Sequence, residues 1–407
     1  MVLWRVTQMR FVAALTLVSC RGCDRGDLGA RDAAPAMAVA PGSSGPSGRA
    51  AHEVALDGPF TADATPKGGV VVAALGQRGA TLGLVRLGAA GDEGSRQVLL
   101  ADAQATGASP SLYAFADGSA GVVFQSTTGT RALRVGVQGE LAGPPLSVID
   151  ACGTEEALVY VDAKSKRLHR WSAKAPQQTL GALLPEGGHL LCGSRAAFVV
   201  VGRGRGFSAT AEDGRSIVLV DGVDPNAEGA SAFYASDVTL GVVAEGERGA
   251  LLWATWRLGD DAPKRRILAT KIGEGQTLNT ADGSDTQVAV LFSKDERGRC
   301  DGDGSATYDL LLAGAPTGER VVAVPRVPCD RDATPPELAY GARGPTLRWL
   351  EWSDERGERQ MKSLVVTDAE PARAVETRLP TDAVPLDCAE LPCAAVTRIG
   401  GRFRVVR

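Results

Sequence analysis

Short apolar runs separated by Gly, Asp and Pro mark the chain from residue 52 onward. They are rich in β-branched and aliphatic residues, and almost no long apolar stripe with the 3.6-residue period of a helix accompanies them. The clearest runs are Val70–Ala73, Gly121–Phe124, Leu158–Val161, Phe198–Val201, Leu240–Val243, Val288–Phe292, Leu347–Leu350 and Ala394–Thr397. This pattern predicts an all-β protein.

The runs recur at intervals of roughly 40 to 60 residues, which indicates a repeated unit. A short segment precedes each run, as Ser109–Ala114 does for the second, and a further alternating strand follows most of them, as Arg131–Val137 does. Cys152–Gly153 and Cys192–Gly193 occupy matching places in consecutive units, a few residues before the apolar run. The unit therefore fits four short strands.

Such repetition resembles that of β-propeller proteins, in which four-stranded blades close into a ring and leave only short edges. The resemblance covers residues from about 52 to 407 and implies a propeller of seven or eight blades, with eight favoured. No WD dipeptide, kelch signature or Asp-box occurs, so the pattern fits no named repeat family. Tandem β-sandwiches are the alternative, because short strands at regular spacing also suit them.

The eighth run leaves room for one more strand, Phe403–Val406. We expect a strand around Glu53–Leu56 to complete this last blade and so to join the two ends of the propeller.

The first residues have the features of an export signal. Arg5 and Arg10 supply positive charge, and Phe11–Val18 is apolar but well short of the roughly 20 residues that a membrane span needs. Leu17–Cys20 then resembles the lipobox of bacterial lipoproteins. The resemblance implies a signal peptide over residues 1–19 and lipidation of Cys20. The alternatives are an ordinary cleaved signal peptide or a short buried helix.

Residues 20–51 follow as a predicted flexible tether, because stretches such as Pro41–Gly48 have too little apolar bulk to fold alone. The propeller-like domain then covers residues 52–407. Arg21 stands where some bacteria place an Asp to keep lipoproteins on the inner membrane, so the outer membrane is the favoured location. Several acyl chains would make such an anchor stable.

Seven cysteines remain if Cys20 is lipidated, and an exported protein is expected to pair them. The preferred pairs are Cys152 with Cys192 across neighbouring blades, Cys300 with Cys329, and Cys388 with Cys393. Cys23 is left over in the tether. A zinc site is a weaker interpretation, because no C-x-x-C pair follows the lipobox and the three His residues lie far away in the sequence.

Composition excludes some classes of function. The chain has 44% hydrophobic and 23% charged residues, which suits a protein with a sizeable core. Its formal net charge is −4 and its basic residues are scattered, so we expect no nucleic-acid partner.

Marks of catalysis are few. The hydrolase elbow, the phosphate-binding loop, an intact dinucleotide fingerprint and the zinc-protease helix are all absent from the sequence. His52, His169 and His189 would act only if the fold gathered them. No residue is therefore predicted to be catalytic.

Two weaker ligand sites are candidates. Asp301 and Asp303 alternate with glycines as in calcium loops, but Leu312 stands where the bidentate Glu of an EF-hand belongs. Calcium is thus the one cofactor considered. The flat faces of Trp253, Trp256, Trp349 and Trp352 would suit a glycan, although large aromatics in strands are more often part of a core.

Two functions of different class follow from these features. The first is a membrane-anchored binding or scaffold protein whose blade-connecting loops hold an envelope protein or a glycan. The second is a propeller-type envelope enzyme, such as a lyase, a hydrolase or a quinone-dependent dehydrogenase. A cluster of titratable groups at one mouth of the central channel would favour the enzyme, whereas small and apolar groups there would favour binding. The sequence favours binding.

Overall fold

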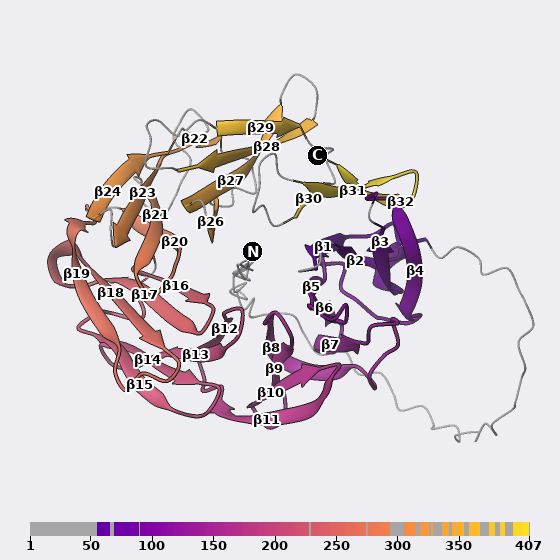
Figure 1. The fold of residues 1–407 in the computed structure, drawn as a ribbon, viewed down its shortest axis with the longest axis horizontal. Helices are drawn as coiled ribbons and strands as arrows, with labels where there is room; N and C mark the ends of the chain where they lie inside the picture. The colour runs from indigo at the N-terminus through magenta and orange to yellow at the C-terminus, as the bar shows by residue number, and fades with distance from the viewer. Residues whose placement is uncertain are drawn as a thin grey trace, which may run out of the picture. The chain divides into compact units, whose positions relative to one another are not determined.

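A computed structural model shows antiparallel sheets arranged as blades around a ring (Figure 1). It describes residues 55–65, 69–88, 90–227, 229–273, 276–293, 305–314, 318–324, 327–328, 336–341, 344–353, 358–366, 374–378, 383–386 and 394–406. Ala55–Arg407 belong to one compact unit. No helix in the described part of the chain has the length and apolar character needed to cross a bilayer.

The first four blades follow one another along the chain, each numbered here from its innermost strand outward. Blade 1 consists of β1 (Phe60–Ala64), β2 (Val70–Leu75), β3 (Leu82–Leu87) and β4 (Glu93–Leu100). Blade 2 consists of β5 (Ser111–Ala114), β6 (Ala120–Ser126), β7 (Gly129–Val135) and the start of β8 (Leu146–Gly153). Blade 3 consists of the rest of β8, β9 (Leu158–Asp162), β10 (Arg167–Ser172) and β11 (Ala175–Leu183). Blade 4 consists of β12 (Gly188–Cys192), β13 (Ala197–Gly202), β14 (Gly206–Ala211) and β15 (Ser216–Asp221).

The remaining blades complete the ring. Blade 5 consists of β16 (Ser231–Ser236), β17 (Thr239–Glu245), β18 (Ala250–Arg257) and β19 (Lys264–Lys271). Blade 6 consists of β20 (Thr277–Gly283), β21 (Gln287–Ser293), β23 (Tyr308–Gly314) and β24 (Gly318–Ala323), with a small ladder of β22 (Ser305–Ala306) and β25 (Val327–Pro328) beside it. Blade 7 consists of β26 (Glu337–Gly341), β27 (Gly344–Ser353), β28 (Glu358–Val365) and β29 (Ala374–Arg378). Blade 8 consists of β30 (Val384–Pro385), β31 (Ala395–Ile399) and β32 (Arg402–Val406). Two 3-10 turns, η1 (Gln77–Gly79) and η2 (Glu247–Gly249), join the second and third strands of blades 1 and 5.

The described residues thus form an eight-bladed β-propeller, which confirms the predicted all-β fold and the favoured blade number. Each predicted apolar run lies in the second strand of its blade, from β2 to β31. A second strand has a neighbouring strand on each side and a neighbouring blade on each face. Most of its consecutive side chains are therefore buried, as Val72 and Ala73 are, and the strand appears in the sequence as an unbroken apolar run.

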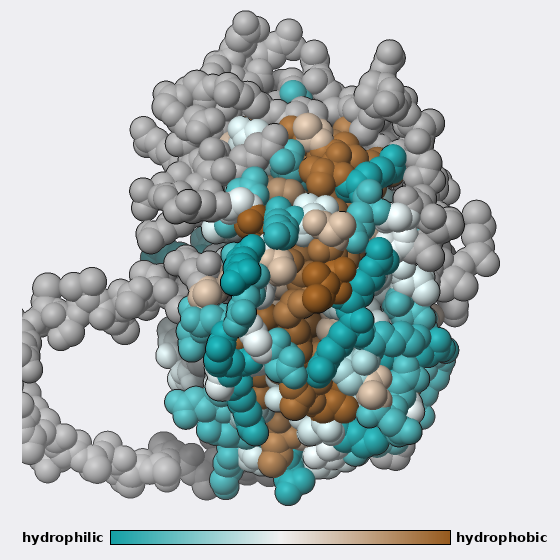
Figure 2. Space-filling model, turned by 90° about the vertical axis from the view of Figure 1, so that its left-hand side faces the viewer, coloured by the Kyte–Doolittle hydropathy of each residue, from teal (hydrophilic) through white to brown (hydrophobic). Residues whose placement is uncertain are grey.

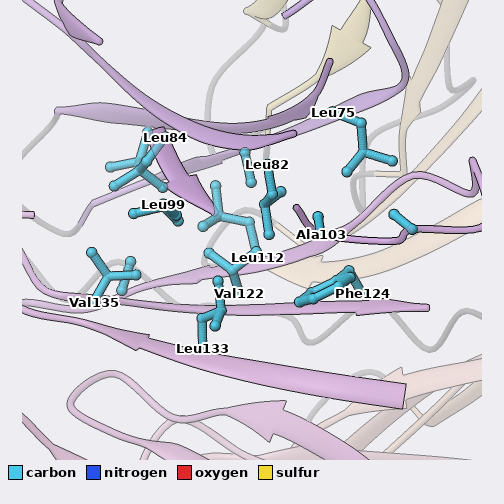
Figure 3. Close-up of a cluster of buried hydrophobic side chains, with 14 of the residues drawn as sticks. Leu75, Leu82, Leu84, Leu99, Ala103, Leu112, Val122, Phe124, Leu133 and Val135 are labelled. Atoms are coloured by element: carbon cyan, nitrogen blue, oxygen red, sulfur yellow. The ribbon is translucent and has the colours of Figure 1, made fainter. Parts of the chain in front are cut away.

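The core lies between the faces of adjacent blades. Figure 3 shows the packing between blades 1 and 2, where side chains of β2 and β3 meet those of β5, β6 and β7. The buried residues labelled there are Leu75, Leu82, Leu84, Leu99, Ala103, Leu112, Val122, Phe124, Leu133 and Val135. Further buried clusters fill the interfaces between consecutive blades from blade 2 to blade 7.

A disulfide joins the innermost strands of blades 3 and 4. Cys152 on β8 and Cys192 on β12 are bonded at 1.99 Å, which confirms this predicted pair. Cys20, Cys23, Cys300, Cys329, Cys388 and Cys393 lie outside the described residues, so lipidation and the other two pairs stay predictions.

The strand expected around Glu53–Leu56 is absent from the described part of that segment, residues 55 and 56. Glu53 lies outside the described residues, and Ala55 and Leu56 are not in a strand. Leu56 is buried against Gly83 of β3, where any Cβ would collide with it, and the amide of Gly58 donates to Leu75. This part of the prediction is wrong for the described residues, because burial of Leu56 holds the segment on blade 1.

Side chains close the ring instead. The Arg398 guanidinium donates to the carbonyl oxygens of Leu56 (2.7 Å) and Gly58 (2.8 Å). It also lies over the rings of Phe60 and Phe403, 5.6 and 5.9 Å from their centroids, and these two rings pack edge to face. Arg398 therefore joins blade 8 to blade 1 by hydrogen bonds and cation–π contacts together.

Strand β32 adds further contacts with blade 1. The amide of Val405 donates to Gly91, and Arg96 donates to the carbonyl of Gly401 at 2.7 Å. Glu93 accepts from both Arg96 and the amide of Phe403. Partial burial disfavours the charged form of Glu93, but these hydrogen bonds outweigh it, so its pKa lies below the ordinary value.

Candidate functional site

The innermost strand of each blade leaves one edge of its backbone without a strand partner, toward the centre of the ring (Figure 1). Carboxylates on three of these strands satisfy amides of the next blade. Asp63 on β1 accepts from the amide of Ala114 (2.7 Å), and Asp150 on β8 accepts from that of Leu190 (3.3 Å). We call Asp63, Asp150 and Asp282 the inner latches, the third being described below.

Asp282 is the most buried inner latch, with only 5% of its surface exposed. One of its carboxylate oxygens accepts from the amide of Tyr340 in blade 7 at 2.6 Å, and the other accepts from Gly283 at 2.8 Å. A carboxylate bonded in this way holds two blades together. It satisfies an edge amide that would otherwise be buried without a partner.

The carboxyl of Asp150 has a perturbed pKa. Burial raises its pKa, and the amides of Leu190 and Ala151 and the nearby His189 only partly offset that effect. His189 lies exposed on β12, next to Leu190, the residue that the latch contacts. Asp150 and His189 are thus a titratable pair on two innermost strands, with the carboxylate already bonded to two amides.

Tyrosines join other neighbouring blades. Tyr113 on β5 donates to the carbonyl of Ala151 at 3.0 Å, and its ring fills the space that Gly153 leaves open. Tyr234 on β16 donates to Ser284 at 2.9 Å and accepts from the indole of Trp253 at 3.0 Å. Full burial raises the pKa of Tyr234, so it stays a neutral donor.

The loops that join the first and second strands of the blades form one face of the ring, because the blades all run in the same sense. We call the loops of blades 2 to 6 the inner-hairpin face; they comprise residues 115–119, 154–157, 193–196, 237–238 and 284–286. Backbone bonds connect the loops of blades 2 to 5 in sequence: Ala116 donates to Glu155, Glu155 donates to Ser194, and Arg195 donates to Asp237. These four loops therefore form a continuous hydrogen-bonded arc, and the hydroxyl of Tyr234 connects blade 5 to Ser284 in the loop of blade 6.

Charges of alternating sign follow this arc. We call Glu155, Arg195, Asp237, Arg257 and Asp285 the charge arc, which extends from blade 3 to blade 6. Arg195 binds Asp237 through two hydrogen bonds, and Arg257 lies 3.9 Å from Asp285. The Arg195 side chain is 61% exposed, so it is available to a partner while the loop beneath it is fixed.

The charges of the arc perturb one another. The hydrogen bond from Arg195 holds the pKa of Asp237 below its ordinary value, with Arg257 adding to the effect. Asp237 in turn raises the pKa of Arg195, and Glu155 adds to that. The ion pair of Arg195 with Asp237 therefore stabilises the charged forms of both partners.

A second ion pair supports the arc from behind. Arg170 on β10 binds Glu212 at 2.6 Å and also donates to the carbonyl of Arg195 at 3.2 Å. Glu212 accepts from the amide of Ala197 at 3.0 Å. The loop that bears Arg195 is thus held from blade 3, blade 4 and blade 5 at once.

The histidines predicted as possible catalysts are not gathered. His169 on β10 stacks on Tyr160 with 5.3 Å between ring centroids and lies 3.3 Å from the hydroxyl of Thr179, whereas His189 is on an innermost strand. His52 lies outside the described residues. In the described part of the chain, no three His, Cys, Asp or Glu side chains are placed to hold a metal ion.

The remaining candidate ligand sites are the calcium loop and the tryptophans. Asp301 and Asp303 lie outside the described residues. Trp253, Trp256 and Trp349 are all at most 6% exposed, so they belong to the core and do not form a glycan-binding surface. Nothing is described of the side chain of Trp352.

The inner latches and the charge arc were not found from the sequence. A weak signal for the latches exists, since Asp63, Asp150 and Asp282 each stand six to eight residues before an apolar run. The charge arc has no such signal in the sequence, because Arg195 and its partner Asp237 are 42 residues apart along the chain.

Comparison with known proteins gives fold likeness alone. No protein-family model matches this chain, and no curated protein matches its sequence. Among solved structures, a prolyl endopeptidase is 12% identical with a TM-score of 0.47; the match covers 86% of this chain and 55% of that one, so this chain spans about half its length. A lectin from Burkholderia pseudomallei is 13% identical with a TM-score of 0.44, covering 79% of this chain and 99% of the lectin. The β-propeller domain of a protease from Pyrococcus furiosus is 10% identical with a TM-score of 0.42, covering 78% and 96%. At these identities the likeness does not extend to function.

Proposed function

We propose that this chain is a lipid-anchored protein of the cell envelope that binds a protein partner through the inner-hairpin face of its propeller. The charge arc is the observation that carries the proposal. Its side chains alternate in sign across blades 3 to 6, and the loops that bear Glu155, Arg195 and Asp237 are bonded to one another. A preorganised polar surface of this kind loses little conformational freedom on binding.

The alternation of charge selects the class of partner. A nucleic acid or another polyanion needs a surface of one sign, whereas Asp237 and Arg195 present both signs side by side. A folded protein can match such a surface with alternating charges of its own, which favours correct pairing and faster association. Arginine is also enriched in protein interfaces.

The anchor is supported by the sequence. Leu17–Cys20 has the residues of a lipobox, and the stretch of residues up to 51 is rich in Gly, Ser, Ala and Pro. A flexible chain of some thirty residues has a root-mean-square reach of about 30 Å. Such a tether lets the propeller turn either face toward a partner in the envelope.

Site-specific photocrosslinking in the native host tests the proposal. A photoreactive residue at Glu156, exposed on the inner-hairpin face, is compared with one at Lys164, exposed at the opposite end of the same strand, β9. We expect one specific protein to be captured from position 156, lost when Arg195→Glu is added, and absent at position 164. The full chain with Cys20→Ala serves as the mislocalised control.

Each outcome decides a part of the proposal. Equal capture at both positions, or capture that Arg195→Glu leaves unchanged, would remove the inner-hairpin face as the binding surface. An unchanged distribution of the Cys20→Ala chain between membrane and soluble fractions would overturn the anchor. Capture of nothing at either position would favour the enzymatic alternative.

A further inference from the structure

Apolar side chains are exposed on the outermost strands of consecutive blades. Val218 on β15, Ile267 on β19 and Val321 on β24 are 52%, 69% and 46% exposed. We call these three residues the outer band. Figure 2, which looks at this side of the ring, shows apolar residues running across the rim between polar borders. Large apolar groups gathered in this way on a surface indicate a contact site.

An added β-strand is a poor fit for the band. Glu319 of blade 6 accepts from the edge amides of Ala269 (2.7 Å) and Thr270 (3.1 Å) on β19. Arg265 of blade 5 donates to the edge carbonyls of Val218 (2.8 Å) and Leu219 (3.1 Å) on β15. Because neighbouring blades already satisfy these backbone groups, the edges offer few hydrogen bonds to an incoming strand.

Positive charge surrounds the most exposed member of the band. Strand β19 has the sequence KRRILATK, with four cations and no acid, in a chain whose net charge is −4. Arg265 and Arg266 are balanced by Asp221 and Glu319, at 3.5 and 3.2 Å. Lys264 and Lys271 are exposed, and neither makes an ion pair within the described residues.

A shallow groove begins beside Ile267. It has a volume of about 220 Å³ and lies between blades 4 and 5. Its lining includes the apolar residues Val220, Leu252 and Ala254, together with Arg265, Arg266 and Asp221. The groove therefore places apolar surface beside two arginines, of which Arg265 is paired with Asp221.

We propose that the outer band binds the surface of a lipid bilayer that contains anionic headgroups. Ile267 enters the boundary between headgroups and acyl chains, while Lys264 and Lys271 contact phosphates on either side of it. An exposed apolar side chain flanked by lysines is the arrangement that interfacial membrane binding requires. The contact is independent of the proposed acyl anchor and of the partner on the inner-hairpin face.

The chain contains a matched control. Leu183 on β11 is also apolar, outermost in its blade and 50% exposed. Strand β11 has the sequence APQQTLGAL and carries no charge. Leu183 therefore has the exposure of the band on a strand without charge, with one cation, Arg167, opposite it on β10.

Sedimentation with vesicles tests the proposal on the full chain carrying Cys20→Ala, so that no acyl group contributes. Vesicles of phosphatidylcholine with about one third phosphatidylglycerol are compared with vesicles of phosphatidylcholine alone. We expect binding to the anionic vesicles to be clearly stronger. Ile267→Ser and the double change Lys264→Gln with Lys271→Gln should each weaken it, by roughly fivefold per lysine, whereas Leu183→Ser should leave it unchanged.

Three results would overturn the proposal. The first is equal binding to both kinds of vesicle. The second is an equal loss with Leu183→Ser and Ile267→Ser. The third is a dimer, seen by sedimentation velocity without vesicles, that Ile267→Ser dissociates, since a second copy of the chain would then cover the band. Circular dichroism and thermal melts confirm that each variant is folded.

Discussion

The junction that closes the ring differs from the junctions inside it. Between blades 6 and 7 the chain continues from one blade to the next, and Asp282 adds a bond to the amide of Tyr340. Between blades 8 and 1 the chain does not continue. The two blades are held together there by contacts of Arg398, of the Phe60–Phe403 pair and of Glu93. A covalent link limits how far two blades can separate. Where that link is absent, side-chain contacts have to supply the cohesion.

The largest effect is expected at the closing junction. Arg398→Met removes two charge-assisted hydrogen bonds and two cation–π contacts, and should lower the free energy of unfolding by about 3 kcal/mol. Urea denaturation measures this change. Arg404→Met is the control, because its ion pair with Asp92 is 3.5 Å long and more than half exposed on both sides. Equal losses for the two variants would contradict a special role for Arg398.

A smaller loss is expected at an internal junction. Asp282→Ala leaves the amide of Tyr340 without its acceptor, which should cost about 2 kcal/mol of unfolding free energy. Asp285→Ala, three residues along and on the exposed charge arc, should cost less than about 0.5 kcal/mol. If Asp282→Ala proved more damaging than Arg398→Met, the contrast between the two kinds of junction would be wrong.

The closing junction and the junction between blades 3 and 4 should respond to acid in opposite directions. The pKa of Glu93 is lower in the folded protein than its unfolded value near 4.3, so its contribution is present above that pH and disappears as the pH falls through the folded value. The pKa of Asp150 is raised, so its ionisation opposes folding as the pH rises through the folded value. The difference in melting temperature between the native chain and Glu93→Gln should therefore shrink from pH 6 to pH 3. A constant difference would show that the charge of Glu93 does not contribute.

The smallest effect on stability is expected at the rim. Arg265→Met uncovers the edge carbonyls of Val218 and Leu219, but water can replace the guanidinium there, so the loss should be below about 0.5 kcal/mol. The exposed edge should instead promote self-association at high concentration. Light scattering during incubation measures this. A variant that stays monomeric but has a clearly lower free energy of unfolding would contradict both expectations.

The sequence predicted the fold because one strand of each blade has a distinctive pattern. Second strands such as β17 are buried on both faces and appear in the sequence as apolar runs. The number of these runs therefore predicted the number of blades. Outermost strands such as β19 face water and were not recognised, because their charged residues hide the strand pattern. Cys152 and Cys192 were paired correctly because they occupy equivalent places in consecutive repeats.

The inner latches could not be predicted from the sequence, and the reason is physical. Asp63, Asp150 and Asp282 bond to amides that are 51, 40 and 58 residues away. Any residue presents an amide, so the partner of such a carboxylate has no sequence signature. Contacts of this kind can be recognised only in the folded ring, where two innermost strands lie side by side.

Strand β8 belongs to two blades. Its first residues, Leu146 and Ser147, pair with β7 of blade 2, and the rest pairs with β9 of blade 3. The same strand carries Cys152, which ties it to blade 4. We therefore expect blades 2, 3 and 4 to unfold as one cooperative unit, so that a change that destabilises one of them speeds the slow amide exchange of all three. A circular permutation that opened the ring between blades 2 and 3 would cut a shared strand, whereas new termini in the connection between β15 and β16 would leave every sheet whole.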